Sequence, residues 1–406
     1  MLEWQTLRSL SGDGRLILLS RSVRLFAFGA LSVILVLHFA SLGWSEASIG
    51  RLLALTMLGD AAVTLWVTLN ADRLGRARML CLGAGLMILV GVVLPLASSA
   101  WIIAPVAFAG AISLNGGEVG PFMAIEQAAL THSLSDAAQR TTAIAWYTLC
   151  GAMATALGAL ASGFLGSYPA VFALYAVCGA LLWGVFTRLS AAIEPQRGGD
   201  SMAPRFGLHK SRSIVLRLSG LFMIDTLGSG LVVQSFLAYW LHRRFGIGTA
   251  AIGSVFFGMN LLAAFSAMVA GRLAARIGLV NTMVWTHIPA NLLLMSVPWM
   301  PSLASAIAVL LLRGCLSQMD VPARQSYLMA VVEPDERSAA GGVTGLAKSL
   351  AGAVSQPITG ALFAAGWLSA PFAAAGALKI VYDLMLWRRF RHLRPPEERR
   401  LRGSGG

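Results

Sequence analysis

Long apolar runs alternate with short polar gaps along the whole chain. Six runs of membrane-spanning length precede residue 190, and six more follow a polar stretch. They lie near residues 16–40, 47–69, 79–99, 101–126, 141–165, 168–187, 213–241, 250–274, 280–299, 302–323, 338–364 and 369–387. Because a helix needs about 20 mostly apolar residues to cross the hydrocarbon core, each run predicts one transmembrane helix. The pattern predicts an all-α polytopic membrane protein with twelve transmembrane helices.

Residues of the first half recur in the second half at a nearly constant spacing. Gly50 corresponds to Gly253 (253 minus 50 is 203), and Gly75 corresponds to Gly278 at the same spacing. Since each half holds an even number of spans, we expect two pseudo-symmetric six-helix bundles with parallel orientation in the membrane. The expected parts are an N-terminal bundle over 1–190, a cytoplasmic linker over 191–212, a C-terminal bundle over 213–390 and a basic cytoplasmic tail over 391–406.

Composition and charge agree with a lipid environment. Hydrophobic residues make up 57% of the chain and charged residues 12%, whereas soluble domains have about 25% charged residues. The net charge of +13 argues little for nucleic acid, because Lys and Arg lie in short gaps and not on one basic face. Basic loops mark the cytoplasmic side, where we expect both termini. We expect a bacterial inner-membrane protein whose first helix directs insertion, without a removable signal peptide.

A charged segment after the second predicted span carries a family signature. It reads Asp72-Arg73-Leu74-Gly75-Arg76. This segment, together with twelve spans in two parallel halves, resembles the major facilitator superfamily (MFS), and the resemblance covers essentially the whole chain. The sequence departs from the usual form of the loop at Thr68, Asn70 and Ala77.

The resemblance implies that this segment takes part in gating. Asp72, Arg73 and Arg76 would form a cytoplasmic latch that opens and closes as the bundles rock, and Gly75 would allow a tight turn. Ala275 stands where the second half would carry the matching aspartate, so we expect the two halves to contribute unequally. The alternative is that these arginines are ordinary topogenic charges.

The fourth and tenth spans are the least regular, and they occupy matching positions in the two halves. One contains Asn115 to Pro121 with Glu118, and the other contains Arg313 to Pro322 with Asp320. Glycine and proline loosen the helix where freed carbonyls need a partner or water, and interrupted spans in matching positions indicate the binding site of a carrier. The alternative is a proline kink whose acid lies at the cytoplasmic headgroups.

Several ionisable side chains lie within the predicted spans, where an isolated charge is costly and indicates a cavity or an ion pair. Asp60 and Asp225 are the predicted proton carriers, although a permanent structural ion pair is the alternative. Basic groups near the middle favour an anionic or zwitterionic substrate. His287 and His38 are weaker candidates, which we expect to be packed or interfacial residues. The predicted substrate and proton pathway comprises Arg24, Asp60, Glu118, Asp225, Arg313, Asp320, Lys348 and Lys379.

Glu126 and Arg324 occupy matching positions with opposite charge (324 minus 126 is 198). Both are placed by the pattern at the cytoplasmic ends of the two irregular spans. We therefore predict a salt bridge between the halves that closes the inner mouth. The alternative is that each residue makes separate local contacts.

The predicted function is secondary transport of a small solute by alternating access. The expected partners are the lipid bilayer, a small-molecule substrate and H⁺ as the coupling ion, with no nucleic acid and with a monomer as the functional unit. We find no catalytic triad, metal-ligand cluster or phosphate loop, so we expect no enzyme, metal or cofactor. A non-transporting membrane sensor on the same scaffold is the alternative, and it is favoured if Asp60, Asp225 and Arg313 are all sealed in dry ion pairs.

Overall fold

The computed structural model describes residues 10–117, 119–120, 122–132, 137–194, 209–333 and 336–390. These residues form helices joined by short turns, and no strand occurs among them. The predicted all-α class is therefore confirmed.

The helices of the first half follow the predicted spans. They are α2 (Gly12–Ser41), α3 (Glu46–Leu74), α4 (Arg76–Val93), α5 (Ala100–Ala109), α6 (Phe122–His132), α7 (Ala137–Phe164) and α8 (Tyr168–Phe186), followed by a short turn of 3-10 helix, η1 (Ala191–Ile193). The fourth predicted span consists of two short helices, α5 and α6, because the glycine-rich segment between them interrupts the helix as its sequence predicts.

The second half repeats this order. Its helices are α9 (Arg212–Leu231), α10 (Gln234–Phe245), α11 (Thr249–Ile277), α12 (Leu279–Ser296), α13 (Leu303–Gly314), α14 (Asp320–Val331), α15 (Arg337–Ala364) and α16 (Ala370–Phe390), with a 3-10 turn, η2 (Val297–Trp299), after α12. The tenth predicted span is broken between α13 and α14, as expected. The seventh span is also broken, between α9 and α10, which the apolar pattern did not predict.

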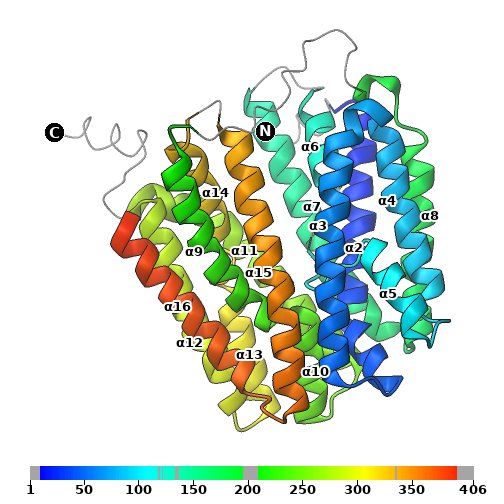
Figure 1. Ribbon diagram of the computed structural model, residues 1–406, viewed down its shortest axis with the longest axis vertical. Helices are drawn as coiled ribbons and strands as arrows, with labels where there is room; N and C mark the ends of the chain where they lie inside the picture. Colours follow the sequence, from blue (N-terminus) through cyan, green and yellow to red (C-terminus); the bar gives the residue numbers. More distant parts are fainter. Residues whose placement is uncertain are drawn as a thin grey trace. The chain divides into compact units, whose positions relative to one another are not determined.

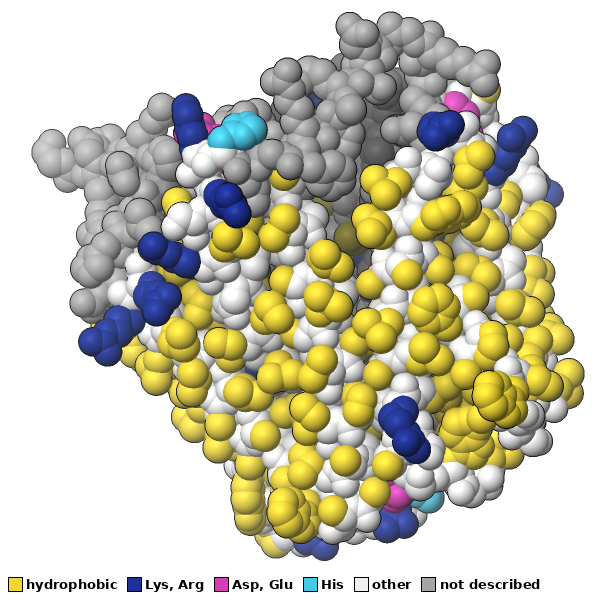
Figure 2. Space-filling model, in the orientation of Figure 1, with side chains coloured by type: hydrophobic (Ala, Val, Ile, Leu, Met, Phe, Trp, Pro, Cys, Tyr) yellow, Lys and Arg dark blue, Asp and Glu magenta, His cyan; other side chains and the backbone are white. Residues whose placement is uncertain are grey.

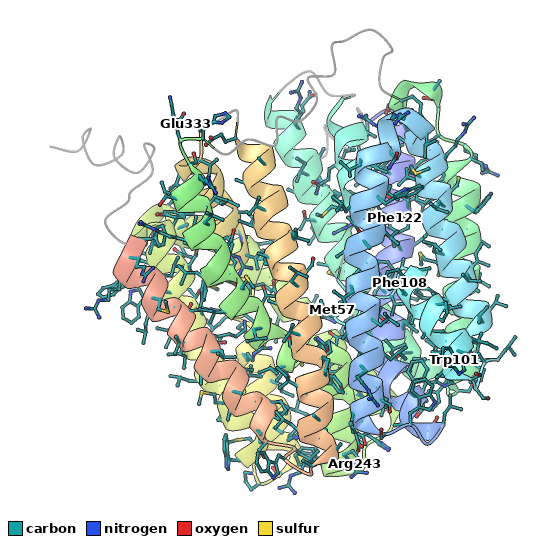
Figure 3. The ribbon with its side chains drawn as sticks, viewed as in Figure 1. Met57, Trp101, Phe108, Phe122, Arg243 and Glu333 are labelled. Carbon is teal, nitrogen blue, oxygen red and sulfur yellow. The ribbon has the colours of Figure 1, made fainter. Side chains whose placement is uncertain are left out.

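Eight helical stretches in the described part of the chain are long and apolar enough to cross a membrane. Many large apolar side chains lie on their outer faces, such as Trp66, Phe265 and Leu384. Figure 2 shows hydrophobic side chains over most of the visible described surface, with Lys and Arg mainly toward the ends of helices. Trp101 on α5 is 90% exposed (Figure 3), and an exposed tryptophan is typical of a side chain that contacts lipid or its headgroups.

By contacts, the chain divides into two compact units. Unit 1 is Met1–Gly199 with Val233–Asn260, and unit 2 is Asp200–Val232 with Leu261–Gly406. Hence α10 and the first part of α11 pack with the first half of the sequence, although we predicted the bundle boundary at residues 191–212. The division into two six-span bundles stays a proposal.

In unit 1, α2 is buried along nearly its whole length and packs against α7, α8 and α10. Gly29 permits the contact with α7, because a Cβ atom there would lie 2.2 Å from the carbonyl oxygen of Thr155. In unit 2, α9 packs against α15 and α16, and α16 packs against α12 (Figure 1). In each unit one helix, α2 or α9, therefore packs against the helices that supply the candidate site; α2 is almost wholly buried, whereas α9 keeps one side exposed.

Candidate functional site

The break in the fourth span is a polar turn inside an apolar unit. Gly116 and Gly120 have positive φ angles of 68° and 78°, a backbone conformation that glycine adopts without steric cost. The Thr155 hydroxyl donates to the Gly116 carbonyl at 3.1 Å, and the Gly120 N–H donates to the Asp60 carboxylate at 2.6 Å. Asp60 therefore satisfies the backbone of the break, and it has no ion pair within the described residues.

The second half of the seventh span closes onto this break within unit 1. The N–H of Ser235 donates to the Leu114 carbonyl at 3.1 Å, and the N–H of Gln234 donates to the Asn115 side chain at 2.9 Å. The Gln234 amide also donates to the Ser32 hydroxyl at 2.8 Å. Backbone groups that the breaks in the fourth and seventh spans leave without helical partners therefore bond to residues of the other break. Burial in an apolar medium requires such partners.

A fully buried ion pair joins α2 and α6 in unit 1. The two terminal nitrogens of Arg24 donate to the two carboxylate oxygens of Glu126 at 2.7 and 2.8 Å, and both side chains are 0% exposed. The hydroxyls of Ser20 and Tyr147 also donate to this carboxylate, at 2.7 and 2.6 Å. The guanidinium of Arg24 lies 4.4 Å from the ring centre of Phe122, which is labelled in Figure 3. This bidentate geometry is the strong form of a charged hydrogen bond.

Unit 2 contains a longer chain of charged groups centred on Asp225 of α9. Arg324 of α14 donates to the Asp225 carboxylate at 2.6 Å, and the ammonium of Lys379 on α16 lies 3.3 Å from its other oxygen. Arg324 also lies 3.7 Å from Asp320, one turn earlier on its own helix. Three predicted pathway residues, Asp225, Asp320 and Lys379, are therefore brought together with Arg324.

This chain of charges continues to a histidine that we expected to be a packing residue. His287 of α12 lies 3.1 Å from the Lys379 ammonium through Nε2 and 2.9 Å from the Asp383 carboxylate through Nδ1. The Asn291 amide donates to the second oxygen of Asp383 at 3.3 Å. The only sequence signal for this group is the polar faces of the ninth and twelfth spans, whose pairing a single sequence does not show.

The ion pairs Arg24–Glu126 and Asp225–Arg324 occupy matching positions of the internal repeat, but the positions of the cation and the anion are exchanged. Arg24 and Asp225 lie 201 positions apart (225 minus 24), and Glu126 and Arg324 lie 198 apart. In each unit the pair joins the first helix of the half to the second helix of its broken fourth span. The repeat therefore preserves the bridge but exchanges which helix carries the cation.

In the structure, Glu126 and Arg324 are each paired with a different residue from the one we predicted. Glu126 is bonded by Arg24 and is fully buried, while Arg324 is bonded by Asp225 and Asp320. Each residue thus has its partner in its own unit, and neither lies exposed at a helix end. Their opposite charges reflect the exchanged polarity of two internal bridges, so each residue makes the separate local contacts that were the alternative. A salt bridge between the halves stays a prediction.

Two predicted pathway residues are half-buried cations without a fixed partner. Lys348 of α15 and Arg313 of α13 make no ion pair within the described residues, and the Nε of Arg313 is buried without a hydrogen bond there. Lys348 interacts electrostatically with Asp225 and Arg324, and Arg313 with Asp320. Both belong to the surroundings of the unit 2 charges. Glu118 lies outside the described residues.

The charged segment after the second span forms the predicted tight turn. Gly75 has a φ of 101° and ends α3, and the N–H groups of Arg76 and Ala77 donate to the Glu194 carboxylate at 2.8 and 3.1 Å. Glu194 caps the start of α4, where a carboxylate is favoured by the helix dipole; we had not predicted this contact. Arg73 is exposed, and the Asp72 side chain lies outside the described part, so the latch itself stays a prediction.

A second carboxylate caps the start of α9. Glu336 is 1% exposed and accepts hydrogen bonds from the backbone N–H groups of His209, Lys210 and Ser211; it lies three residues after Glu333, which is labelled in Figure 3. A hydrogen bond from the Ser211 side chain and these backbone donors lower the pKa of Glu336 to about 2. The charged carboxylate is therefore the form that fixes the start of α9.

This cap predicts a pH-dependent difference between the native protein and Glu336→Gln. Because the folded-state pKa of Glu336 is depressed to about 2 from its ordinary 4.5, its contribution to stability is complete above the ordinary pKa and is lost as the pH falls through the folded one. We expect the variant to melt at a lower temperature at pH 7, with the gap closing in acid. Thermal unfolding in detergent across pH measures this, and a gap that does not narrow in acid contradicts it.

Comparison with known proteins identifies the family. The sequence model of the Major Facilitator Superfamily matches residues 17–355. The chain belongs to the MFS. A curated relative from Saccharomyces cerevisiae, described as an uncharacterized membrane protein, YJR124C, is 29% identical over 419 residues and covers 93% of both chains. The MFS resemblance that the sequence suggested is thereby confirmed.

Solved structures of MFS transporters share this fold. The nucleoside transporter NupG aligns with a TM-score of 0.72 at 14% identity, covering 94% of this chain and 100% of its own. A D-xylose-proton symporter aligns at 0.71 and 13%, covering 92% and 97%, and the human organic anion transporter MFSD10 at 0.61 and 17%, covering 93% and 100%. At such identities the likeness concerns the fold alone, and membership of the Major Facilitator Superfamily indicates a multi-pass membrane transporter.

Proposed function

We propose that this MFS member carries a small organic anion or zwitterion across a membrane by alternating access, coupled to proton movement. We further propose the bacterial inner membrane as its location, with both termini cytoplasmic and the monomer as the functional unit. Two of the similar folds belong to a proton symporter and an organic anion transporter, which is compatible with this proposal.

The observation that carries the proposal is a surplus of cations without fixed partners in unit 2. Lys348 and Arg313 have no ion pair within the described residues, and Arg324 keeps 16% of its side chain exposed beside them. Charged groups in membrane helices are retained where they face a pathway or a partner, and guanidinium and ammonium groups bind carboxylates and phosphates. A substrate anion would supply the missing charge.

A membrane sensor would be favoured if Asp60, Asp225 and Arg313 were all sealed in ion pairs, and the described residues do not show this arrangement. Of the three residues named for that test, only Asp225 lies in a buried ion pair, whereas Asp60 and Arg313 make none among the described residues. Similar solved structures are transporters. We therefore propose transport and not sensing.

Purified protein in liposomes tests the proposed function. Uptake of radiolabelled carboxylates, phosphate esters, amino acids and cationic drugs is measured with and without an imposed pH gradient, against liposomes that lack protein. We expect protein-dependent uptake of at least one anion or zwitterion, which increases when the gradient is imposed. Uptake of cationic compounds alone would contradict the proposed substrate class.

Lys348→Met is predicted to weaken substrate binding without destabilising the protein. Because Lys348 has no ion pair among the described residues, its removal leaves no buried charge behind, whereas an anionic substrate loses one charged contact worth about 1.5–3 kcal/mol. We expect KM for the anion to rise about tenfold or more, with an unchanged melting temperature. Lys210→Met, which removes an exposed lysine, is the matched control; equal KM values in both variants would exclude Lys348 from the site.

A further inference from the structure

We propose that His287 and Asp383 of unit 2 form the proton-uptake site of the transporter, and that protonation moves Lys379 onto Asp225 and releases Arg324 to bind an anionic substrate. This inference rests on the proposed function and deepens it, because it assigns the coupled proton to a site and links it to the anion. It replaces Asp225 as the predicted proton carrier.

The groups form one continuous chain across four helices. Asp383 Oδ1 lies 2.9 Å from His287 Nδ1, His287 Nε2 lies 3.1 Å from Lys379 Nζ, and Lys379 Nζ lies 3.3 Å from Asp225 Oδ1. The second oxygen of Asp225 accepts from Arg324 at 2.6 Å. A change at the Asp383 end can therefore reach Arg324 through four contacts, each between neighbouring charged or polar groups.

Among the carboxylates of this charged cluster, Asp383 has neither Lys nor Arg as a hydrogen-bond or ion-pair partner within the described residues. Asp225 is bonded by Arg324 and Lys379, and Asp320 lies beside Arg324. Asp383, which is 0% exposed, contacts only His287 and Asn291 among the described residues. A buried carboxylate without a cationic partner is costly, and a proton on His287 supplies that partner directly.

The hydrogen-bond pattern fixes where the incoming proton binds. An ammonium has donors and no acceptor, so the contact with Lys379 requires that Nε2 of His287 accepts. The neutral ring then carries its proton on Nδ1 and donates it to Asp383. The additional proton must therefore bind Nε2, which yields an imidazolium that is hydrogen-bonded to Asp383.

Protonation removes the acceptor that Lys379 uses on His287. The imidazolium and the ammonium then repel each other, and the remaining partner of Lys379 is Asp225, whose Oδ1 lies 3.3 Å from the ammonium and 3.9 Å from Nε2 of His287. As Lys379 moves closer to Asp225, it neutralises the carboxylate that holds Arg324. The guanidinium of Arg324, which is 16% exposed, becomes available to an anion. Proton and anion binding thus favour each other, which is positive thermodynamic coupling.

The other charged and polar groups that surround these side chains are compatible with the proposed movement of Lys379 and release of Arg324. On α16, Tyr382 packs edge-on against His287 with ring centres 6.2 Å apart. Lys348 on α15 acts electrostatically on Asp225 and Arg324, and Arg313 on α13 acts on Asp320. Both cations thus act at the Arg324 end, where the anion would bind.

Imidazole titration tests the proton site without any substrate. In protein labelled with ¹⁵N-histidine, the His287 signal is assigned by its loss in His287→Gln and followed over about pH 5 to 9 by NMR. We expect the native protein to show the imidazolium signal of His287 at the acid end of this range, and Asp383→Asn, which lacks the partner charge, to show less of that signal at the same pH. His242→Gln, which removes an exposed histidine, is the control. No titration of His287 in this range overturns the proposal.

Transport in liposomes tests the coupling. We expect His287→Gln and Asp383→Asn to bind the anion more weakly than the native protein, because Arg324 stays on Asp225, and to lose accumulation of the anion under an imposed pH gradient by about tenfold or more. Full gradient-driven accumulation in both variants overturns the proton site while leaving the transporter intact. If the native protein carries no anion at all, the proposed function fails, and the titration still decides whether His287 and Asp383 bind a proton.

Discussion

Glu126→Gln is expected to destabilise the protein by about 3 kcal/mol or more, because it leaves the Arg24 guanidinium buried without its carboxylate. Both side chains of this pair are 0% exposed, so water does not compensate the remaining charge. The hydroxyls of Ser20 and Tyr147 would also lose a charged acceptor. Thermal unfolding in detergent measures the effect as a clear fall in the apparent melting temperature.

Glu46→Gln is the matched control for this change. Glu46 lies in the same unit at the start of α3, is half-buried and accepts one hydrogen bond from Tyr239 at 2.6 Å. Its amide retains an acceptor for that bond, so we expect a much smaller change in melting temperature. Equal melting temperatures of Glu126→Gln and the native protein would show that the Arg24 pair contributes nothing to stability.

Asp225→Asn is expected to abolish gradient-driven transport and to lower stability by about 3 kcal/mol, because the buried Lys379 and the half-buried Arg324 lose the carboxylate between them. Arg324 and Lys379 would then repel each other across a neutral amide. Liposome flux and thermal unfolding, measured on the same preparation, separate the two effects.

Two further variants make this prediction specific. In Asp60→Asn the amide oxygen can still accept from the Gly120 N–H, so we expect nearly native flux; a loss equal to that of Asp225→Asn would restore Asp60 as a proton carrier. The double variant Asp225→Asn with Lys379→Met removes both charges of one contact, and we expect it to regain most of the stability without regaining gradient-driven accumulation. Stability no better than that of Asp225→Asn would contradict a direct pairing of these side chains.

The sequence predicts most of the secondary structure because the membrane leaves few alternatives. Most described helices lie in or overlap a predicted span, whereas α6 and α14 extend well beyond the predicted ends of theirs. The agreement arises because hydrocarbon requires each backbone group to be bonded within the chain. The breaks of the fourth and tenth spans follow from clustered glycine and proline. The break of the seventh span between Leu231 and Gln234 follows Gly228-Ser229-Gly230, a glycine signal that we did not use. There the Gly230 and Leu231 carbonyls accept from Gln356 and Thr359 of α15, a contact that local sequence does not contain.

The sequence identifies most of the charged residues of the candidate site but not which of them contact each other. The apolar pattern identifies Arg24, Asp225 and Lys379 as charges that require a partner. Which carboxylate meets which cation depends on how α9, α12 and α16 pack, and contacts such as that between His287 and Asp383, 96 positions apart, arise only then. The matching positions of Glu126 and Arg324 in the repeat suggested a salt bridge between them. In the structure each residue instead pairs with the first helix of its own half, Glu126 with Arg24 and Arg324 with Asp225.

The position of α10 has a consequence for how the chain can be divided. This helix follows residue 212 in sequence but packs against α2 in unit 1. A chain cut between residues 194 and 209 would therefore give a first fragment that lacks part of its own core and a second fragment that carries it. When two such fragments are produced together, α10 of the second should pack against α2 of the first and hold the fragments together without a covalent link.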